Sequence, residues 1–147
     1  MKTIVAVLSL VACSYSFAGD WGSTNRLATG LSVVSIVMPT GKLQLAWKPQ
    51  IIPGDDLLLL TMKIGAETFY RRYIFLGVRG GSLQLTSTVG SESRPRDSSP
   101  APLFVEPSAD GTYYFVPDDL RNEGVVKITR SANFPGYYSV TVVKGFK

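Results

Sequence analysis

The best candidates for catalytic residues in this sequence are two pairs of adjacent carboxylates, Asp55–Asp56 and Asp118–Asp119. Two carboxyl groups can work together as acid and nucleophile, or as acid and base, in glycoside hydrolysis. The first pair follows Pro53–Gly54 and the second follows Pro117. In such contexts aspartate commonly forms a turn by accepting hydrogen bonds from nearby backbone. We therefore expect two turns here rather than a catalytic site, and a protein that is not an enzyme.

The residues that are missing narrow the chemistry further. The chain has no His, and its single Cys is Cys13. Imidazole-based zinc sites, Ser-His-Asp systems and Cys-His systems all require residues that this sequence lacks. We accordingly expect no metal site and no cofactor.

A cluster of aromatic and basic residues is the best candidate for binding a receptor. Tyr70, Arg71, Arg72 and Tyr73 follow Phe69 directly, and exposed aromatic and arginine side chains are common in interfaces. Neighbouring residues of a strand point to opposite faces, so Phe69, Arg71 and Tyr73 should share one face, and Tyr70 and Arg72 the other. An ordinary sheet surface would show the same arrangement. The net charge of only +4 does not favour nucleic acid as a partner.

The composition predicts the scaffold that would carry these residues. Valine, isoleucine, threonine and aromatic residues are frequent, whereas 14 Gly and 9 Pro divide the 147 residues into short segments. Both features favour strands, and the length suits one domain. We predict an all-β fold, a sandwich or a barrel.

The first 18 residues have the order of a secretory signal peptide. Lys2 precedes an apolar stretch from Ile4 to Cys13, and small residues at Ser16 and Ala18 mark a cut before Gly19. The stretch is too short to span a bilayer. A second interpretation stays open, because residues 10–13 are similar to a lipobox that would lipidate Cys13. Both interpretations predict an exported protein.

Alternation of apolar and polar residues predicts the strands that follow. In Gly41–Lys48, Leu43, Leu45 and Trp47 fall on one face, and Lys42, Gln44 and Lys48 on the other. Residues 57–64 are expected to form a strand buried on both faces, and residues 90–102 a polar loop. The sequence predicts turns at 79–81 and 109–111, and further strands at 69–78, 82–88, 103–105, 112–116, 125–130 and 137–143.

In the last of these strands we expect Tyr138, Val140 and Val142 to point into the core. Tyr137, Ser139 and Thr141 should face outward. Residues 103–143 should then hold three or four antiparallel strands.

The uncharged segment from Leu27 to Val37 is the most informative stretch of the sequence. An unpaired apolar strand recruits other chains, so this segment must pair somewhere. It is either the first strand of its own sheet or a strand donated to another copy. As a donor strand we predict that it buries its bulkier parity, Leu27, Leu31, Val33 and Val37. The strand-forming positions on that parity are Leu27, Thr29, Leu31, Val33, Ser35 and Val37.

Both ends of the chain resemble the subunits of bacterial chaperone–usher fimbriae. Residues 35–49, SIVMPTGKLQLAWKP, are similar to the junction between the extended N-terminus and the first strand of such subunits. Residues 135–143, PGYYSVTVV, resemble the signature that opens their last strand. The lack of cysteine after residue 18 is similar to the capsule-like and colonisation-factor type.

The resemblance implies an incomplete immunoglobulin-like β-sandwich, completed by a strand from a neighbour. Residues 1–18 would be the signal peptide, 19–38 the donor-strand extension and 39–147 the pilin domain. It implies a structural subunit of a surface fimbria, a role in adhesion to a host and virulence, and transit through the periplasm. Its partners would be a periplasmic chaperone, an outer-membrane usher, further subunits and a host receptor. The alternative is a monomeric secreted or lipid-anchored β-sandwich that binds a ligand.

Overall fold

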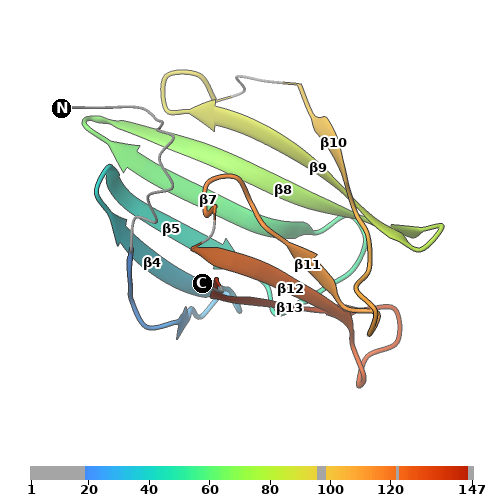
Figure 1. Ribbon diagram of the computed structural model, residues 1–147. Helices are drawn as coiled ribbons and strands as arrows, with labels where there is room; N and C mark the ends of the chain where they lie inside the picture. Colours follow the sequence, from blue (N-terminus) through green and yellow to red (C-terminus); the bar gives the residue numbers. More distant parts are fainter. Residues whose placement is uncertain (1–18, 96–98, 122, 146–147) are drawn as a thin grey trace.

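The computed structural model describes residues 19–95, 99–121 and 123–145, and in these ranges all regular structure is β (Figure 1). Two antiparallel sheets enclose one hydrophobic core to which both contribute side chains. The predicted all-β class is therefore confirmed, and the arrangement is consistent with a sandwich. The signal peptide predicted at residues 1–18 lies outside the described residues.

The large sheet has eight strands, in the order β10-β9-β8-β7-β5-β4-β2, with β3 also paired to β4. Neighbours along this sheet are nearly always neighbours in the chain, as in a meander. The strands are β2 Asp20–Trp21, β3 Asn25–Arg26, β4 Ser32–Met38, β5 Gly41–Trp47, β7 Asp56–Ile64, β8 Glu67–Arg79, β9 Ser82–Ser91 and β10 Ala101–Val105.

The small sheet has four strands, in the order β11-β12-β13-β6. Three of them are consecutive, whereas β6 comes from the link between β5 and β7 and pairs with the start of β13. This short pairing ties the two sheets together. The strands are β6 Gln50–Ile51, β11 Tyr113–Phe115, β12 Gly124–Arg130 and β13 Tyr138–Lys144.

Most predicted strands are present, and their inward residues are the predicted ones. Leu43, Leu45 and Trp47 are buried in β5, and the same holds for Tyr138, Val140 and Val142 in β13. Residues 103–143 hold parts or all of four strands, β10 to β13, as expected, although β10 begins at Ala101 and β13 ends at Lys144. Aromatic rings fill the space between the sheets, with Tyr73 against Phe115 at 4.9 Å and Phe75 against Tyr138 at 5.0 Å between ring centroids.

The prediction for residues 57–64 is only partly correct. Leu57, Leu58 and Leu60 are buried, but Leu59 is 37% exposed and Ile64 is 49% exposed. Leu57 and Leu58 are both buried because the ladder with β8 shifts register beside them. Beyond that point one side of β7 belongs to the outer face of the large sheet, which is open to solvent, so burial on both faces is wrong there.

The predicted turns are present, and the predicted loop is shorter than expected. Arg79 pairs with Ser82 across Gly80 and Gly81, whose φ angles of 58° and 85° suit the primed two-residue turns of hairpins. At the second turn, the Gly111 amide donates to the Ser108 carbonyl. The loop was expected at residues 90–102, but β9 continues to Ser91 and β10 already begins at Ala101. The ends of the expected loop therefore belong to these two strands.

Candidate functional site

The N-terminal edge of the large sheet is the candidate site, defined here as residues 19–38 with the β5 edge that receives them (Figure 1). β4 pairs with β5 over seven residues, from Ser32 opposite Trp47 to Met38 opposite Gly41. Its other edge pairs with β2 and β3, which belong to the same segment. Every strand pairing between this segment and the rest of the described chain therefore runs through β5.

A tight turn joins the segment to the domain. Pro39 and Thr40 lie between the paired residues Met38 and Gly41. Gly41 has a φ of 153°, and a Cβ there would lie 2.7 Å from the carbonyl oxygen of Lys63. Glycine is required at this position because the backbone of β7 comes so close.

The side chains that β4 buries have the opposite parity to the prediction. Val34 is 2% exposed and Ile36 is 0% exposed, whereas Leu27 is 49% and Val37 is 57% exposed. Side-chain bulk was therefore the wrong criterion, because the segment is not one continuous strand. A turn interrupts it, in which the Leu27 amide donates to the Leu31 carbonyl at 2.7 Å and Gly30 has a φ of 84°.

The predicted donor positions are consequently not on one buried stripe. Two of them lie in the exposed turn and the others on or near the outer face of β4. Leu27, Thr29 and Val37 are exposed, and Leu31, Val33 and Ser35 are half-buried.

The start of the segment is anchored to the small sheet. The backbone amide of Gly19 donates to Oε1 of Glu123 at 3.1 Å, across 104 residues of sequence. Oε2 of Glu123 is buried and has no hydrogen-bond partner among the residues that the structure describes. The ring of Trp21 lies so close to Gly124 that a Cβ on Gly124 would be 2.8 Å from it.

The residues predicted to bind a receptor are divided between the two faces of β8. Tyr73 is buried and Arg71 half-buried on the inner face, whereas Tyr70 and Arg72 lie on the outer face, in agreement with the predicted alternation. Phe69 has the parity of Arg71 and Tyr73, but its side chain is 43% exposed. The four side chains therefore do not form a single surface. A receptor role for Tyr70 and Arg72 stays a prediction.

Arg71 holds one of the carboxylates singled out in the sequence. Its Nε donates to Oδ2 of Asp119 at 2.8 Å, and each side chain is 31% exposed. Burial raises the pKa of the Asp119 carboxyl, although the Arg71 guanidinium opposes this effect. Burial, followed by the nearby Asp119 charge, raises the pKa of Tyr73 to about 12.

Asp55 and Asp118 lie in turns, as predicted, whereas Asp56 begins β7 and its carboxylate binds Arg72. Asp55 Oδ2 accepts a hydrogen bond from the Ile52 amide at 3.1 Å and faces Lys48 Nζ at 3.4 Å. The Pro117 carbonyl accepts from the Leu120 amide at 3.0 Å, which closes the turn that contains Asp118. Asp119 differs from the prediction because its carboxylate binds Arg71 instead of local backbone.

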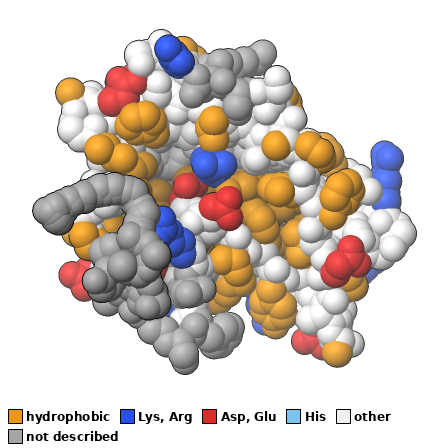
Figure 2. Space-filling view, turned by 45° about the horizontal axis from the view of Figure 1, so that its top comes forward, with side chains coloured by type: hydrophobic (Ala, Val, Ile, Leu, Met, Phe, Trp, Pro, Cys, Tyr) orange, Lys and Arg blue, Asp and Glu red, His pale blue; other side chains and the backbone are white. Residues whose placement is uncertain are grey.

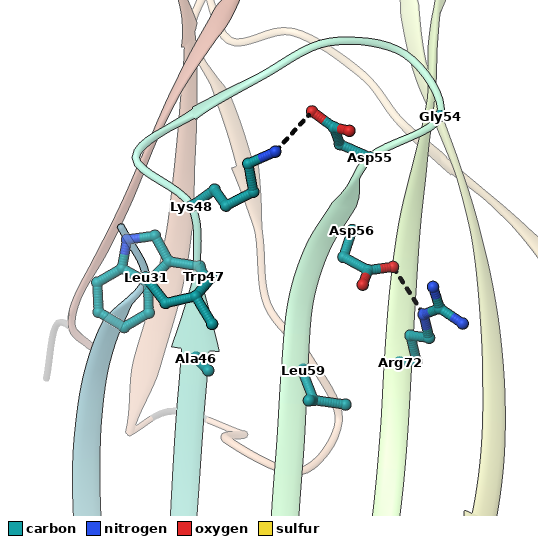
Figure 3. Close-up of a pocket in the computed structure, with 9 residues that line it drawn as sticks. All are labelled: Leu31, Ala46, Trp47, Lys48, Gly54, Asp55, Asp56, Leu59 and Arg72. Carbon is teal, nitrogen blue, oxygen red and sulfur yellow. Dashed lines mark hydrogen bonds and ion pairs between the residues drawn. The ribbon is translucent and has the colours of Figure 1, made fainter. Parts of the chain in front are cut away.

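A shallow pocket of about 290 Å³ lies on the outer face of the large sheet (Figure 3). It brings together Leu31 from the predicted donor segment and Arg72 from the predicted receptor cluster. Two ion pairs line it, Lys48 with Asp55 and Arg72 with Asp56, the latter at 2.6 Å. The charges cancel within the pocket. Its remaining lining residues are Ala46, Trp47, Gly54 and Leu59.

Apolar side chains are also exposed outside this pocket. Figure 2 shows hydrophobic side chains distributed over one face of the molecule, with acidic and basic groups adjacent near its centre. Within the described ranges, the most exposed large apolar side chain is Phe104 of the edge strand β10, at 64%.

Comparison of the chain with protein-family models, with curated proteins and with solved structures gave no match. Among the described residues no helix has the length and apolarity needed to cross a membrane. In the same ranges no group of three or more acidic, His or Cys side chains is arranged to hold a metal ion. Sequence reasoning missed the contact between Gly19 and Glu123, since no local pattern links residues so far apart.

Proposed function

We propose that the protein is an exported structural subunit of a surface fibre, assembled by exchange of residues 19–38 between copies. In this proposal the segment takes the same place beside β5 of the next subunit that it occupies in its own chain. The observation that carries the proposal is that β4 supplies two almost completely buried side chains, yet every strand pairing of residues 19–38 with the rest of the described chain runs through β5. Such a segment can be exchanged as a unit.

Burial explains why the place beside β5 cannot stay empty. Val34 and Ile36 are almost completely buried, and removing each from water contributes about 1.5–3 kcal/mol. Without the segment, these contacts and the β4–β5 ladder are lost, and an apolar strand edge is open to other chains. A strand from another protein must then fill the place. This is the physical role expected of a chaperone strand before assembly.

The resemblance of residues 35–49 and 135–143 to chaperone–usher subunits supplies the biological setting. The proposal accordingly includes a periplasmic chaperone, an outer-membrane usher and delivery to the cell surface. In this proposal, the described domain without residues 19–38 corresponds to the incomplete immunoglobulin-like sandwich of that family. Adhesion to a host receptor through Tyr70 and Arg72 is part of the same proposal.

Cysteine pairs distinguish exchange from a closed monomer. Ser35 and Gln44 are opposite each other in β4 and β5, and opposite residues of antiparallel strands have Cα atoms about 4.5–5.5 Å apart, within disulfide range. We expect the S35C/Q44C protein, oxidised after assembly, to give a ladder of covalent multimers on a non-reducing gel. Cys13→Ser in the same chain removes the competing thiol.

The matched control pair is Q84C/F104C, which joins β9 to β10. These strands are not exchanged in the proposal, so oxidation should leave only monomers. If the oxidised S35C/Q44C protein also gives only monomers, its β4 stays in its own sheet and the exchange is wrong.

The pocket on the outer face supports the second candidate function, a monomeric exported sandwich that binds a small ligand. Its lining combines paired charges with the apolar side chains of Leu31 and Leu59. Fully intramolecular S35C/Q44C disulfides, together with a monomeric mass in solution, would favour this candidate.

A further inference from the structure

We propose that Glu123 is a receptor for a newly formed N-terminus, which arises when the chain is cut before Gly19. The cut hydrolyses the peptide bond between Ala18 and Gly19 with one water molecule. It leaves a carboxylate on the leader and an α-ammonium group on Gly19. The ammonium then binds the Glu123 carboxylate, and this ion pair fastens the N-terminal segment to the small sheet.

The geometry of the carboxylate carries the inference. One oxygen, Oε1, accepts the Gly19 backbone N–H at 3.1 Å, and the other, Oε2, is buried and finds no partner in the described part of the chain. A buried carboxylate oxygen without a hydrogen-bond partner is costly, and such atoms in native proteins call for an explanation. An amide offers a single hydrogen and no net charge. An ammonium at the same nitrogen offers three hydrogens and the opposite charge, so it satisfies this site where an amide cannot.

The fold holds the Gly19 nitrogen in place. Asp20 pairs with Val37 and Trp21 with Ile36 directly after it. Gly19 itself lies so close to Ile36 that a Cβ on residue 19 would be 2.5 Å from the side chain of Ile36. Glycine is therefore the residue that lets the chain start at this point.

Hydrogen bonds also hold the backbone of Glu123 in place. Its amide donates to the Leu120 carbonyl at 2.7 Å, and its carbonyl accepts from the Gly145 amide at 2.7 Å. The backbone of Glu123 is thus held at the corner where the turn before β12 meets the end of β13. Since both groups are preorganised, forming the ion pair orders few additional side chains.

The contact forms in the same way whether residues 19–38 lie beside β5 of their own chain or of a neighbouring copy, because in both cases Gly19 lies next to the Glu123 of the domain that the segment occupies. It predicts a difference between cut and uncut protein. The free ammonium should make the N-terminal segment harder to detach, so removal of the leader also stabilises the first strands.

A double-mutant cycle tests the inference. One axis compares protein starting with a free Gly19 amine with protein whose Gly19 is N-acetylated, and the other compares Glu123 with Glu123→Gln. We expect acetylation to raise the unfolding equilibrium constant about tenfold in the parent chain, and by less than twofold with Glu123→Gln. Equal effects of acetylation in both backgrounds would overturn the proposal.

The control substitution is Glu92→Gln, because Oε1 of Glu92 also accepts a backbone amide, that of Thr68 at 2.9 Å, away from any terminus. The tenfold effect of acetylation should persist in this background. If Glu123→Gln prevents folding, a protein with one serine added before Gly19 replaces it, since this moves the ammonium away while Glu123 stays intact. That protein should lose the tenfold advantage; if it keeps the advantage, the proposal is wrong.

The processing step is measured separately. The full chain is expressed with export, and the exported protein is analysed by intact mass spectrometry. We expect a mass that corresponds to residues 19–147. A chain that begins at a lipidated Cys13, or at any residue other than Gly19, would overturn the inference while leaving the cysteine test of fibre assembly unaffected.

Discussion

The two faces of the large sheet use the same residue types for different purposes. On β4, Ile36 points inward and is fully buried, whereas its neighbour Val37 points outward and is 57% exposed. On β8, Arg71 binds Asp119 on the inner face and Arg72 binds Asp56 on the outer face. Residue type alone therefore does not decide the contribution of a side chain. The contribution depends on the face of the sheet on which the side chain lies, because the face determines how far the side chain is removed from water.

The largest difference is expected for the two branched residues of β4. Ile36→Ala removes buried methyl and methylene groups and leaves a cavity, which should lower the free energy of unfolding by about 2–5 kcal/mol. Val37→Ala should change it by less than about 1 kcal/mol, mainly through strand propensity. Urea denaturation of both variants measures the two values. Similar losses would show that β4 does not separate an inner from an outer face.

A smaller difference is expected for the two arginines. Arg71→Ala leaves the partly buried Asp119 carboxylate without its cation and should cost about 1–2 kcal/mol, between the values typical of exposed and buried pairs. Arg72 and Asp56 are more exposed, so Arg72→Ala should change stability by about 0.5 kcal/mol or less. Thermal unfolding at low and high salt compares them. Equal effects would place both ion pairs on equivalent surfaces.

Burial on the inner face should also raise the pH at which a tyrosine ionises. The pKa of Tyr73 is raised to about 12, first by burial and then by the charge of Asp119. Asp119→Asn removes that negative charge and should lower the pKa of Tyr73, whereas Asp56→Asn on the outer face should leave it unchanged. Absorbance titration of the phenolate, with Tyr73→Phe to identify the signal, measures the effect. An unaltered titration in Asp119→Asn would contradict the assigned cause.

The smallest effect concerns acid stability. Because the pKa of Asp119 is raised in the folded state, the folded protein holds this proton more tightly than the unfolded chain. The resulting stabilisation is complete below the unfolded pKa of about 3.9 and is lost as the pH rises through the higher folded pKa. The native protein should therefore gain stability relative to Asp119→Asn as the pH falls through the raised folded pKa towards about 3.9. Melting temperatures across this range measure it, and the opposite slope would contradict the sign.

The sequence predicted elements well where a clean alternation ran unbroken between turn residues. β5 and β13 are such cases, because their apolar residues lie at every second position and one face must be buried. In the segment 27–37, the buried parity differs from the predicted one for a physical reason. Both parities carry apolar residues, and the turn at Gly30 separates Leu27 and Leu31 from β4, so bulk could not decide the register.

The candidate site was predictable only in part. The uncharged segment before Pro39 indicated a strand that must pair, but its partner β5 could not be distinguished from a neighbouring copy by composition. The pairing of Arg71 with Asp119 and of Gly19 with Glu123 depends on how the two sheets pack. Contacts between residues so distant in the chain leave no trace in local periodicity.

The bulge in β8 has a consequence for changes in the length of this strand. Phe75 is opposite Leu85 and Gly77 is opposite Gln84, so Leu76 is an extra residue without a partner on β9. Deleting Leu76 would leave every other pair in register and every side chain on its present face. Deleting a residue in the paired stretch before the bulge, such as Tyr70, would turn part of the strand inside out. Residue 76 is therefore where β8 can best lose a residue.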